Sequence, residues 1–170
     1  MPTRAASPDL KMLQRLDHQL CFALYSSSLA MTKLYKPVLA PLGLTYPQYL
    51  VLLVLWETDA IGVGELGERL FLDSGTLTPL LKRMESAGLL ARARDAADER
   101  RVVVTLSAAG RALRRKSERV PLAVACAAGR PLAELTALTA QLHALRANLT
   151  RPPRAAATRR SPPPTPKEAR

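Results

Sequence analysis

The sequence predicts a mainly α-helical protein with a small β-hairpin wing, that is, a winged helix-turn-helix flanked by N- and C-terminal helices. Three observations predict this fold. Apolar residues recur at helical spacing through most of the first 150 residues. Near the middle of the chain, a short turn separates two short helical segments. Two β-favouring runs with a polar connection follow directly, as in a hairpin.

The N-terminal third of the chain contains two helical patterns. In the first, from Pro8 to Lys36, leucines and methionines recur at spacings of three, four and seven, and Pro37 is expected to close the helix. A short turn or helix ending at Gly43 follows. From Thr45 to Glu57 apolar residues cover nearly every face, which is typical of a buried helix. We expect this second helix to form the centre of the core.

The helix-turn-helix pattern begins with a short helix over Val63–Leu70, followed by a turn over Phe71–Ser74 and a second helix that stops at Gly88. The runs LLARAR and RVVVTL then form strands, and the polar segment DAADER between them forms an arginine-rich loop. Helix, turn, helix and hairpin in this order predict a winged helix.

The start of the second helix is ambiguous in the sequence. If Asp73 or Ser74 caps it, Pro79 falls inside the helix and removes a backbone hydrogen bond. Thr78 as N-cap, with Pro79 at the first helical position, satisfies the capping rules better. The two alternatives differ by about one helical turn.

The C-terminal part is expected to be helical up to a tail. Ser107 is a suitable N-cap for a helix broken at Pro121, and Pro131 opens a last helix to about Leu149. Residues 1–150 therefore form one predicted domain. The segment 151–170 holds six of the fourteen prolines, so we expect a disordered Pro/Arg-rich tail.

The formal net charge of +11 is concentrated in two stretches. Eleven basic and five acidic residues give residues 74–119 a net charge of +6, and the tail carries +5. Charge localised in this way predicts a polyanion-binding surface, although a solvated charged face is the alternative. The second helix of a helix-turn-helix enters the major groove of DNA, and the wing reaches the minor groove. The candidate contacts are Ser74, Thr76, Thr78, Lys82 and Arg83 on the helix, and Arg100 and Arg101 on the wing.

These candidates have structural alternatives. Each hydroxyl can instead cap a helix, and the wing arginines can be solvated. Asp98, two residues before Arg100, is placed to orient one guanidinium group bidentately.

Other functional classes find little support in the composition. No run approaches the length of a membrane span and no signal peptide is evident, so a cytoplasmic location is expected. Cys21 and Cys126 are 105 positions apart, and no metal-binding spacing is present, so neither a metal nor another cofactor is expected.

Several segments together resemble the MarR family of bacterial dimeric winged-helix repressors. They are LDHQLCFALYSS, LTYPQY, SGTLTPLLKRME and DERRVVVTLS, within a match from about Leu16 to Pro121. The motifs LCFALYS and LTYPQY are similar to the organic hydroperoxide regulators, the OhrR branch, and the second cysteine to their two-Cys type. The resemblance implies a homodimer, built by the N- and C-terminal helices, that binds double-stranded inverted-repeat operator DNA. It also implies that organic hydroperoxide is the inducer.

The same resemblance implies residue roles. Cys21 matches the peroxide-sensing thiol, and Cys126 matches the resolving thiol supplied by the other subunit. Tyr35 and Tyr46 match two tyrosines that hydrogen-bond the sensing thiol, and Tyr25 matches a third that helps reshape the site. On the DNA side, Arg100 with Asp98 matches the wing contact, and Ser74, Thr76 and Lys82 lie on the recognition helix.

The chemistry of the residues is compatible with this reading. Peroxides oxidise the thiolate, and with only His18 as a nearby cationic candidate, phenolic donors are suitable thiolate partners for Cys21. Oxidation to a sulfenic acid followed by disulfide formation with Cys126 would release DNA. We predict a regulator and not an enzyme. The alternatives are a MarR-type repressor that binds a phenolic ligand and has inert cysteines, and a thiol peroxidase.

Overall fold

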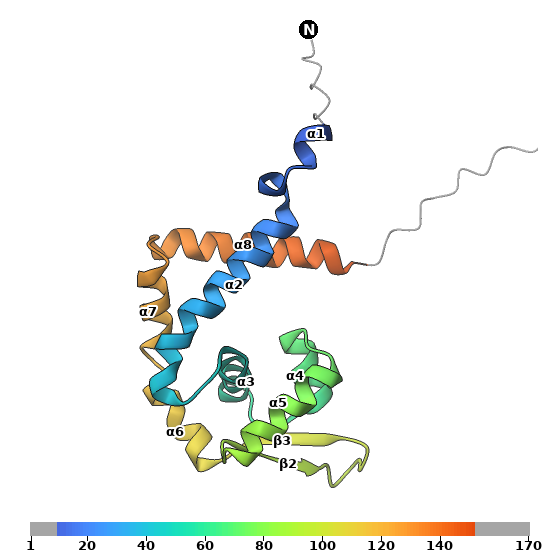
Figure 1. The fold of residues 1–170 in the computed structure, drawn as a ribbon. Helices are drawn as coiled ribbons and strands as arrows, with labels where there is room; N and C mark the ends of the chain where they lie inside the picture. The colour runs from blue at the N-terminus through green and yellow to red at the C-terminus, as the bar shows by residue number, and fades with distance from the viewer. Residues whose placement is uncertain (1–9, 152–170) are drawn as a thin grey trace, which may run out of the picture. The chain divides into compact units, whose positions relative to one another are not determined.

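The computed structural model describes residues 10–151, whose elements are labelled in Figure 1. The chain divides into two units between Gly129 and Arg130, and each is described by itself. Apart from Arg151, the tail expected at 151–170 lies outside the described residues, as do the first two residues of the helix expected from Pro8.

The N-terminal helix differs from the single helix expected over residues 8–36. It consists of α1 (Leu10–Leu13), a 3-10 turn (Leu16–His18) and α2 (Leu20–Leu39). The backbone is extended at Gln19, and no residue of the 3-10 turn is buried. Packing supplies most helix stability, and none is available here to carry the helix through this polar stretch.

Pro37 does not close α2, contrary to the prediction. It lies inside the last turn of the helix, where its fixed φ is compatible with helical backbone and its missing N–H removes one hydrogen bond near the end. A second 3-10 turn (Ala40–Leu42) follows, and Gly43 ends it with a left-handed φ of 67°. The predicted stop at Gly43 is confirmed.

Helix α3 (Tyr46–Glu57) forms the centre of the core, as predicted. Thr45 and Gln48 form a capping box at its start, and six of its twelve residues are buried. Trp56 reaches the first turn of the later helix α6, where its Nε1 donates a hydrogen bond to the Gly110 carbonyl at 3.0 Å. A Cβ at Gly110 would lie 2.1 Å from the Leu89 carbonyl oxygen, so only glycine allows this approach.

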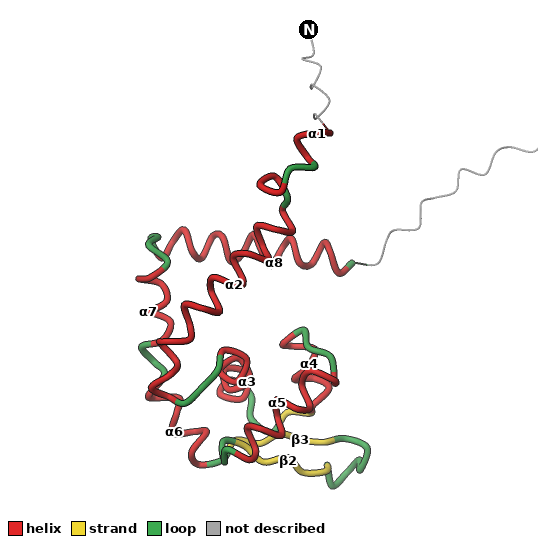
Figure 2. The backbone as a smooth tube through the Cα atoms, viewed as in Figure 1, coloured by secondary structure: helices red, strands yellow, loops and turns green. Residues whose placement is uncertain are grey.

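The winged helix is confirmed. It contains α4 (Val63–Leu70), α5 (Ser74–Ser86), β2 (Leu90–Arg94) and β3 (Val102–Leu106), with β2 and β3 antiparallel from Leu90 opposite Leu106 to Arg94 opposite Val102. A third strand that we did not predict, β1 (Ile61–Gly62), pairs with the other side of β3, as the strands in Figure 2 indicate. Two residues are too short to show a strand period in the sequence.

Helix α5 starts at the earlier of the two possible positions. The Asp73 carboxylate accepts hydrogen bonds from the Thr76 backbone N–H at 2.8 Å and from the Thr76 hydroxyl at 3.1 Å. These bonds, the backbone one first, hold the pKa of Asp73 below its usual range. Pro79 lies inside the helix, so the preference for Thr78 as N-cap was wrong. Four buried side chains of α5 offset the lost hydrogen bond: Leu77, Leu80, Leu81 and Met84.

The helix after the wing also stops earlier than expected. Ser107 caps α6 (Ala108–Lys116) by accepting from the Gly110 N–H, as predicted. The helix ends at Lys116, and Pro121 lies in the first turn of a separate helix, α7 (Val120–Ala127). Proline suits a helix start because its missing N–H has no partner there. The expected break at Pro121 is therefore the beginning of the next helix.

The second unit contains α8 (Leu132–Thr150), which Pro131 precedes as predicted. None of its described residues is buried, and four of its leucines are exposed: Leu132, Leu138, Leu142 and Leu149. Exposed apolar side chains in such number indicate a surface that a partner covers.

No single helix within residues 10–151 is both long and apolar enough to cross a membrane, although the bent pair formed by residues 20–42 and 46–57 passes by length and composition.

Candidate nucleic-acid interface and thiol site

The outer surface of α5 carries the side chains predicted to contact DNA. Burial of the leucines and Met84 directs the opposite side of the helix to solvent, where Ser74, Thr76, Lys82 and Arg83 are exposed and Thr78 is half-buried. The Thr76 hydroxyl donates to Asp73, so it has the capping role that was its structural alternative. The recognition surface therefore contains two free-standing basic residues beside the capped start of the helix.

The tip of the wing presents Arg100 to solvent. Its backbone N–H and its Nε donate to Asp98 Oδ1 at 3.1 and 3.2 Å, and its side chain is 92% exposed. The expected orienting role of Asp98 is thus present, but the side-chain contact uses Nε and is not bidentate. Asp98 fixes the base of the guanidinium group, and the side chain extends into solvent.

Arg101 has different surroundings from Arg100. Its Nη1 lies 3.8 Å from the Asp95 carboxylate, and its side chain is 57% exposed. The guanidinium group lies over Gly62, where an added Cβ would be 3.2 Å from Nη2. Arg101 therefore lies against the base of the wing, whereas Arg100 projects from it.

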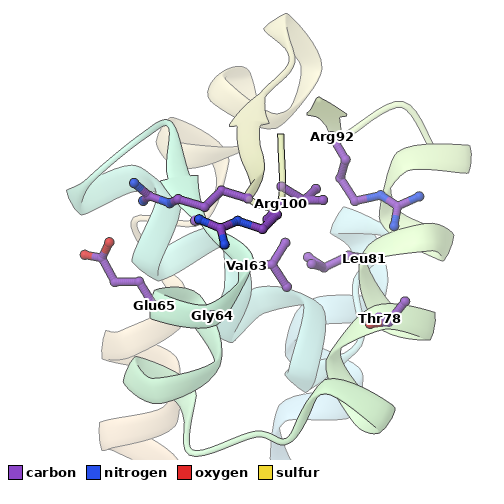
Figure 3. Close-up of a pocket in the computed structure, with 10 residues that line it drawn as sticks. Val63, Gly64, Glu65, Thr78, Leu81, Arg92 and Arg100 are labelled. Atoms are coloured by element: carbon purple, nitrogen blue, oxygen red, sulfur yellow. The ribbon is translucent and has the colours of Figure 1, made fainter. Parts of the chain in front are cut away.

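A hollow joins the wing to the recognition helix. Figure 3 shows Arg92 and Arg100 around it, with Val63 and Leu81 on its floor and Thr78 on α5. Because three arginines of the wing line this hollow together with the half-buried Thr78, its charge favours an anion.

Glu85 and Arg92 fix the wing to the recognition helix. The Glu85 carboxylate accepts from the Arg92 backbone N–H at 2.9 Å, from Nε at 3.0 Å and from Nη2 at 2.6 Å. The side-chain bond first and the backbone bond next hold the pKa of Glu85 below its usual range. Sequence reasoning missed this pair, because Glu85 and Arg92 belong to different elements and only the fold brings them together.

Glu85→Gln should make the stability of the protein less dependent on pH in acid. Because folding lowers the pKa of Glu85, its contribution is present above the unfolded pKa and disappears as the pH falls through the folded value. We expect Tm between about pH 3 and 6 to fall less steeply in the variant than in the wild type. The matched control is Glu118→Gln, an exposed glutamate outside the wing, and parallel Tm profiles for all three proteins would contradict the assignment.

The two cysteines are both exposed. Cys21 is the second residue of α2, where backbone N–H groups lack intrahelical partners and the helix dipole favours an anion. The sequence pattern placed Cys21 in mid-helix and hid this feature. Tyr25 lies one turn further on the same helix and is exposed, and Cys126 lies near the end of α7.

The tyrosines predicted to support the thiolate form a pair distant from Cys21 of the same chain. The Tyr35 and Tyr46 ring centroids are 4.4 Å apart. Fourteen residues of continuous helix separate Cys21 from Tyr35, or roughly 21 Å along the axis. Burial raises the pKa of both tyrosines, so their hydroxyls remain protonated donors at neutral pH. One protomer does not bring the thiol and the tyrosine pair together.

Tyr49 and Trp56 extend this aromatic pair toward the wing. Tyr49 lies 6.1 Å from Tyr35 and 6.1 Å from Trp56 between ring centroids, and Trp56 donates to Gly110 at the start of α6. Neither residue was singled out from the sequence, although their spacing from Tyr46 along one helix was a usable signal. In the described residues no group of three or more His, Cys, Asp and Glu side chains could hold a metal ion.

Comparison with known proteins identifies relatives of the chain. The family model of transcriptional regulator SarA/Rot matches residues 33–116. The HTH-type transcriptional regulator TtmR of Methylorubrum extorquens is 52% identical over 136 residues, 80% of this chain and 70% of TtmR. The organic hydroperoxide resistance transcriptional regulator of Bacillus subtilis is 54% identical over 107 residues, 63% of this chain and 73% of that protein.

Solved structures of AbfR, a protein of Staphylococcus epidermidis, share the fold. Reduced AbfR bound to DNA is 35% identical with a TM-score of 0.66, and the match covers 82% of this chain and 97% of AbfR. The disulfide-formed AbfR is 33% identical with a TM-score of 0.53, over 84% of this chain and 96% of AbfR.

Proposed function

Because the chain belongs to the MarR family of winged-helix transcriptional regulators, of the SarA/Rot type, we propose that it is a homodimeric repressor that releases operator DNA when an organic hydroperoxide oxidises Cys21. The observation that carries this proposal is the exposed position of Cys21 in the first turn of α2, in a chain 54% identical to an organic hydroperoxide resistance regulator. The winged helix supplies the DNA-binding surface.

The DNA partner is double-stranded. In a homodimer, the two α5 helices enter successive major grooves about 34 Å apart, so the operator is an inverted repeat. Lys82 and Arg83 contact the groove and its phosphates, and Ser74 and Thr78 lie beside them. Arg100 enters the adjacent minor groove, where negative potential is concentrated. Support comes from the exposure of these side chains and from the DNA-bound structure of AbfR.

The thiol site is completed by the second subunit. Tyr35 and Tyr46 are too far from Cys21 of their own chain, and their protonated hydroxyls are suitable donors to a thiolate. We place this pair beside the partner's Cys21, with Tyr25 on the same helix as the thiol. The apolar surface that such a dimer buries includes Leu20, Leu29 and Met31 of α2 and the exposed leucines of α8.

Oxidation proceeds in two balanced steps. The Cys21 thiolate attacks one peroxide oxygen, the O–O bond breaks, and with one proton the products are a sulfenic acid and an alcohol. The Cys126 thiol of the other subunit then attacks the sulfenic sulfur, which releases water and leaves an intersubunit disulfide. A cellular dithiol restores both thiols. The peroxide is consumed once per switch, which distinguishes this role from that of a thiol peroxidase.

The disulfide is expected to move the wings. Joining two cysteines requires Cα atoms within about 7 Å, so helices that begin further apart must shift. The aromatic series from Tyr46 through Tyr49 to Trp56 connects the site to Gly110, beside the base of the wing. The higher TM-score to reduced, DNA-bound AbfR than to the disulfide-formed protein supports a reduced state that binds DNA.

The test is DNA binding before and after oxidation. A duplex is first selected by the reduced wild-type protein from a randomised pool, and its affinity is then measured with and without one equivalent of cumene hydroperoxide per subunit. We expect the affinity to fall at least tenfold and to recover with dithiothreitol. Unchanged affinity would favour a repressor that responds to a phenolic ligand, and the consumption of many peroxide equivalents with dithiol would favour a peroxidase.

A further inference from the structure

Phe71 combines two unfavourable features at the turn of the helix-turn-helix. It ends α4 in the left-handed conformation, with φ 55° and ψ 38°, where glycine is the usual residue. Its side chain is also 61% exposed. Neither the backbone nor burial of the ring explains an aromatic residue at this position. Strained residues that persist in this way are concentrated at functional sites.

The turn around Phe71 is tightly fixed. The Leu72 N–H donates to the Gly67 carbonyl at 3.0 Å, and a Cβ at Gly67 would lie 2.9 Å from the Leu72 carbonyl oxygen. Two residues after Phe71, Asp73 caps the recognition helix. The orientation of the ring is therefore set by the same turn that sets the start of α5.

The ring borders a hollow that continues the DNA-facing end of α5. This hollow is lined by Phe71, Leu72 and Leu77 together with Ser74, the first residue of the helix. The carboxylates at its edge, Glu68 and Asp73, disfavour a phosphate group. The apolar parts of DNA, the deoxyribose edge and the thymine methyl group, are the surfaces that match this environment.

We propose that Phe71 packs its ring against a deoxyribose or a thymine methyl group of the DNA strand beside the groove that α5 enters. The contact lets an uncharged residue contribute to affinity next to the arginines and lysines of the winged helix. It also explains why the left-handed position holds phenylalanine in place of glycine. This inference rests on the proposed DNA binding and adds a contact that charge and motif analysis did not identify.

The test compares three variants that separate the ring from the backbone conformation. Phe71→Gly removes the strain and the ring, Phe71→Asn tolerates the left-handed backbone but lacks the ring, and Phe71→Tyr keeps the ring. Affinity of the reduced protein is measured on the selected duplex and on a fixed 24-base-pair duplex of arbitrary sequence at low salt. The second duplex tests the ring contact even if the wild-type protein selects no sequence, so that outcome would count against the proposed repressor alone.

Both variants that lack the ring should bind about tenfold more weakly, an effect of the size expected when apolar ring surface is left unburied. Their Tm should equal or exceed that of the wild type, and the slope of log affinity against log salt should not change, because no phosphate contact is lost. Phe71→Tyr should bind within about twofold of the wild type.

Replacing thymine by uracil in the selected duplex identifies the contacted group. A loss confined to the thymine duplex assigns the methyl group, and an equal loss on every duplex assigns the sugar. Wild-type affinity in the glycine and asparagine variants would overturn the proposal. A lower Tm in both would also overturn it, since the ring would then stabilise the fold.

Discussion

Cys21→Ser should bind the selected duplex as the reduced wild-type protein does and should keep that affinity after hydroperoxide treatment. Serine is close in size and Cys21 is exposed, so the fold and the DNA surface should be unaffected. The hydroxyl does not ionise near neutral pH and is not oxidised by peroxide, which removes the first step of the switch. The expected contrast is retention of binding in the variant against at least a tenfold loss in the wild type, measured by fluorescence anisotropy.

Cys126→Ser is the matched control for this result, because it removes the only other thiol of the chain. It should still react at Cys21, so peroxide should consume one thiol per subunit, but no intersubunit disulfide should appear on non-reducing gels. Excess peroxide should then carry Cys21 beyond the sulfenic acid to states that dithiothreitol does not reverse. Peroxide-driven release in Cys21→Ser would show that Cys21 is not the sensor.

Arg100→Ala should weaken binding to the selected duplex by roughly 10- to 100-fold without altering the dimer. The side chain is 92% exposed and its printed contact is to Asp98 in the same turn, so its removal should not disturb the core. One lost phosphate or minor-groove contact should also reduce the salt slope of binding by about one unit. Anisotropy at three salt concentrations measures both quantities, and sedimentation confirms the dimer.

Two further arginines act as controls for Arg100. Arg119→Ala removes an exposed positive charge outside the winged helix and should change affinity by less than about twofold. Arg101→Ala should have an intermediate effect, because its guanidinium group lies over Gly62 near Asp95. Equal losses in all three variants would mean that net charge, and not the wing, determines binding.

The sequence was most informative where local chemistry decides the structure. The capping residues Thr45 and Ser107, the stop at Gly43 and the alternation of strands and turns gave correct elements in the winged helix. It failed at prolines, where the context determines the outcome. Pro37 and Pro79 lie inside helices whose packing compensates for a lost hydrogen bond, and Pro121 begins a helix.

The candidate site divides in the same way. The sequence by itself identified the exposed basic residues of α5 and the wing, the two thiols and the tyrosines, since residue type and spacing are visible in one dimension. Only the tertiary structure decided that Cys21 begins a helix and that Tyr35 pairs with Tyr46 roughly 21 Å away along α2. It alone placed Glu85 on Arg92 and exposed Phe71, because contacts between separate elements and backbone conformation depend on packing across the whole chain.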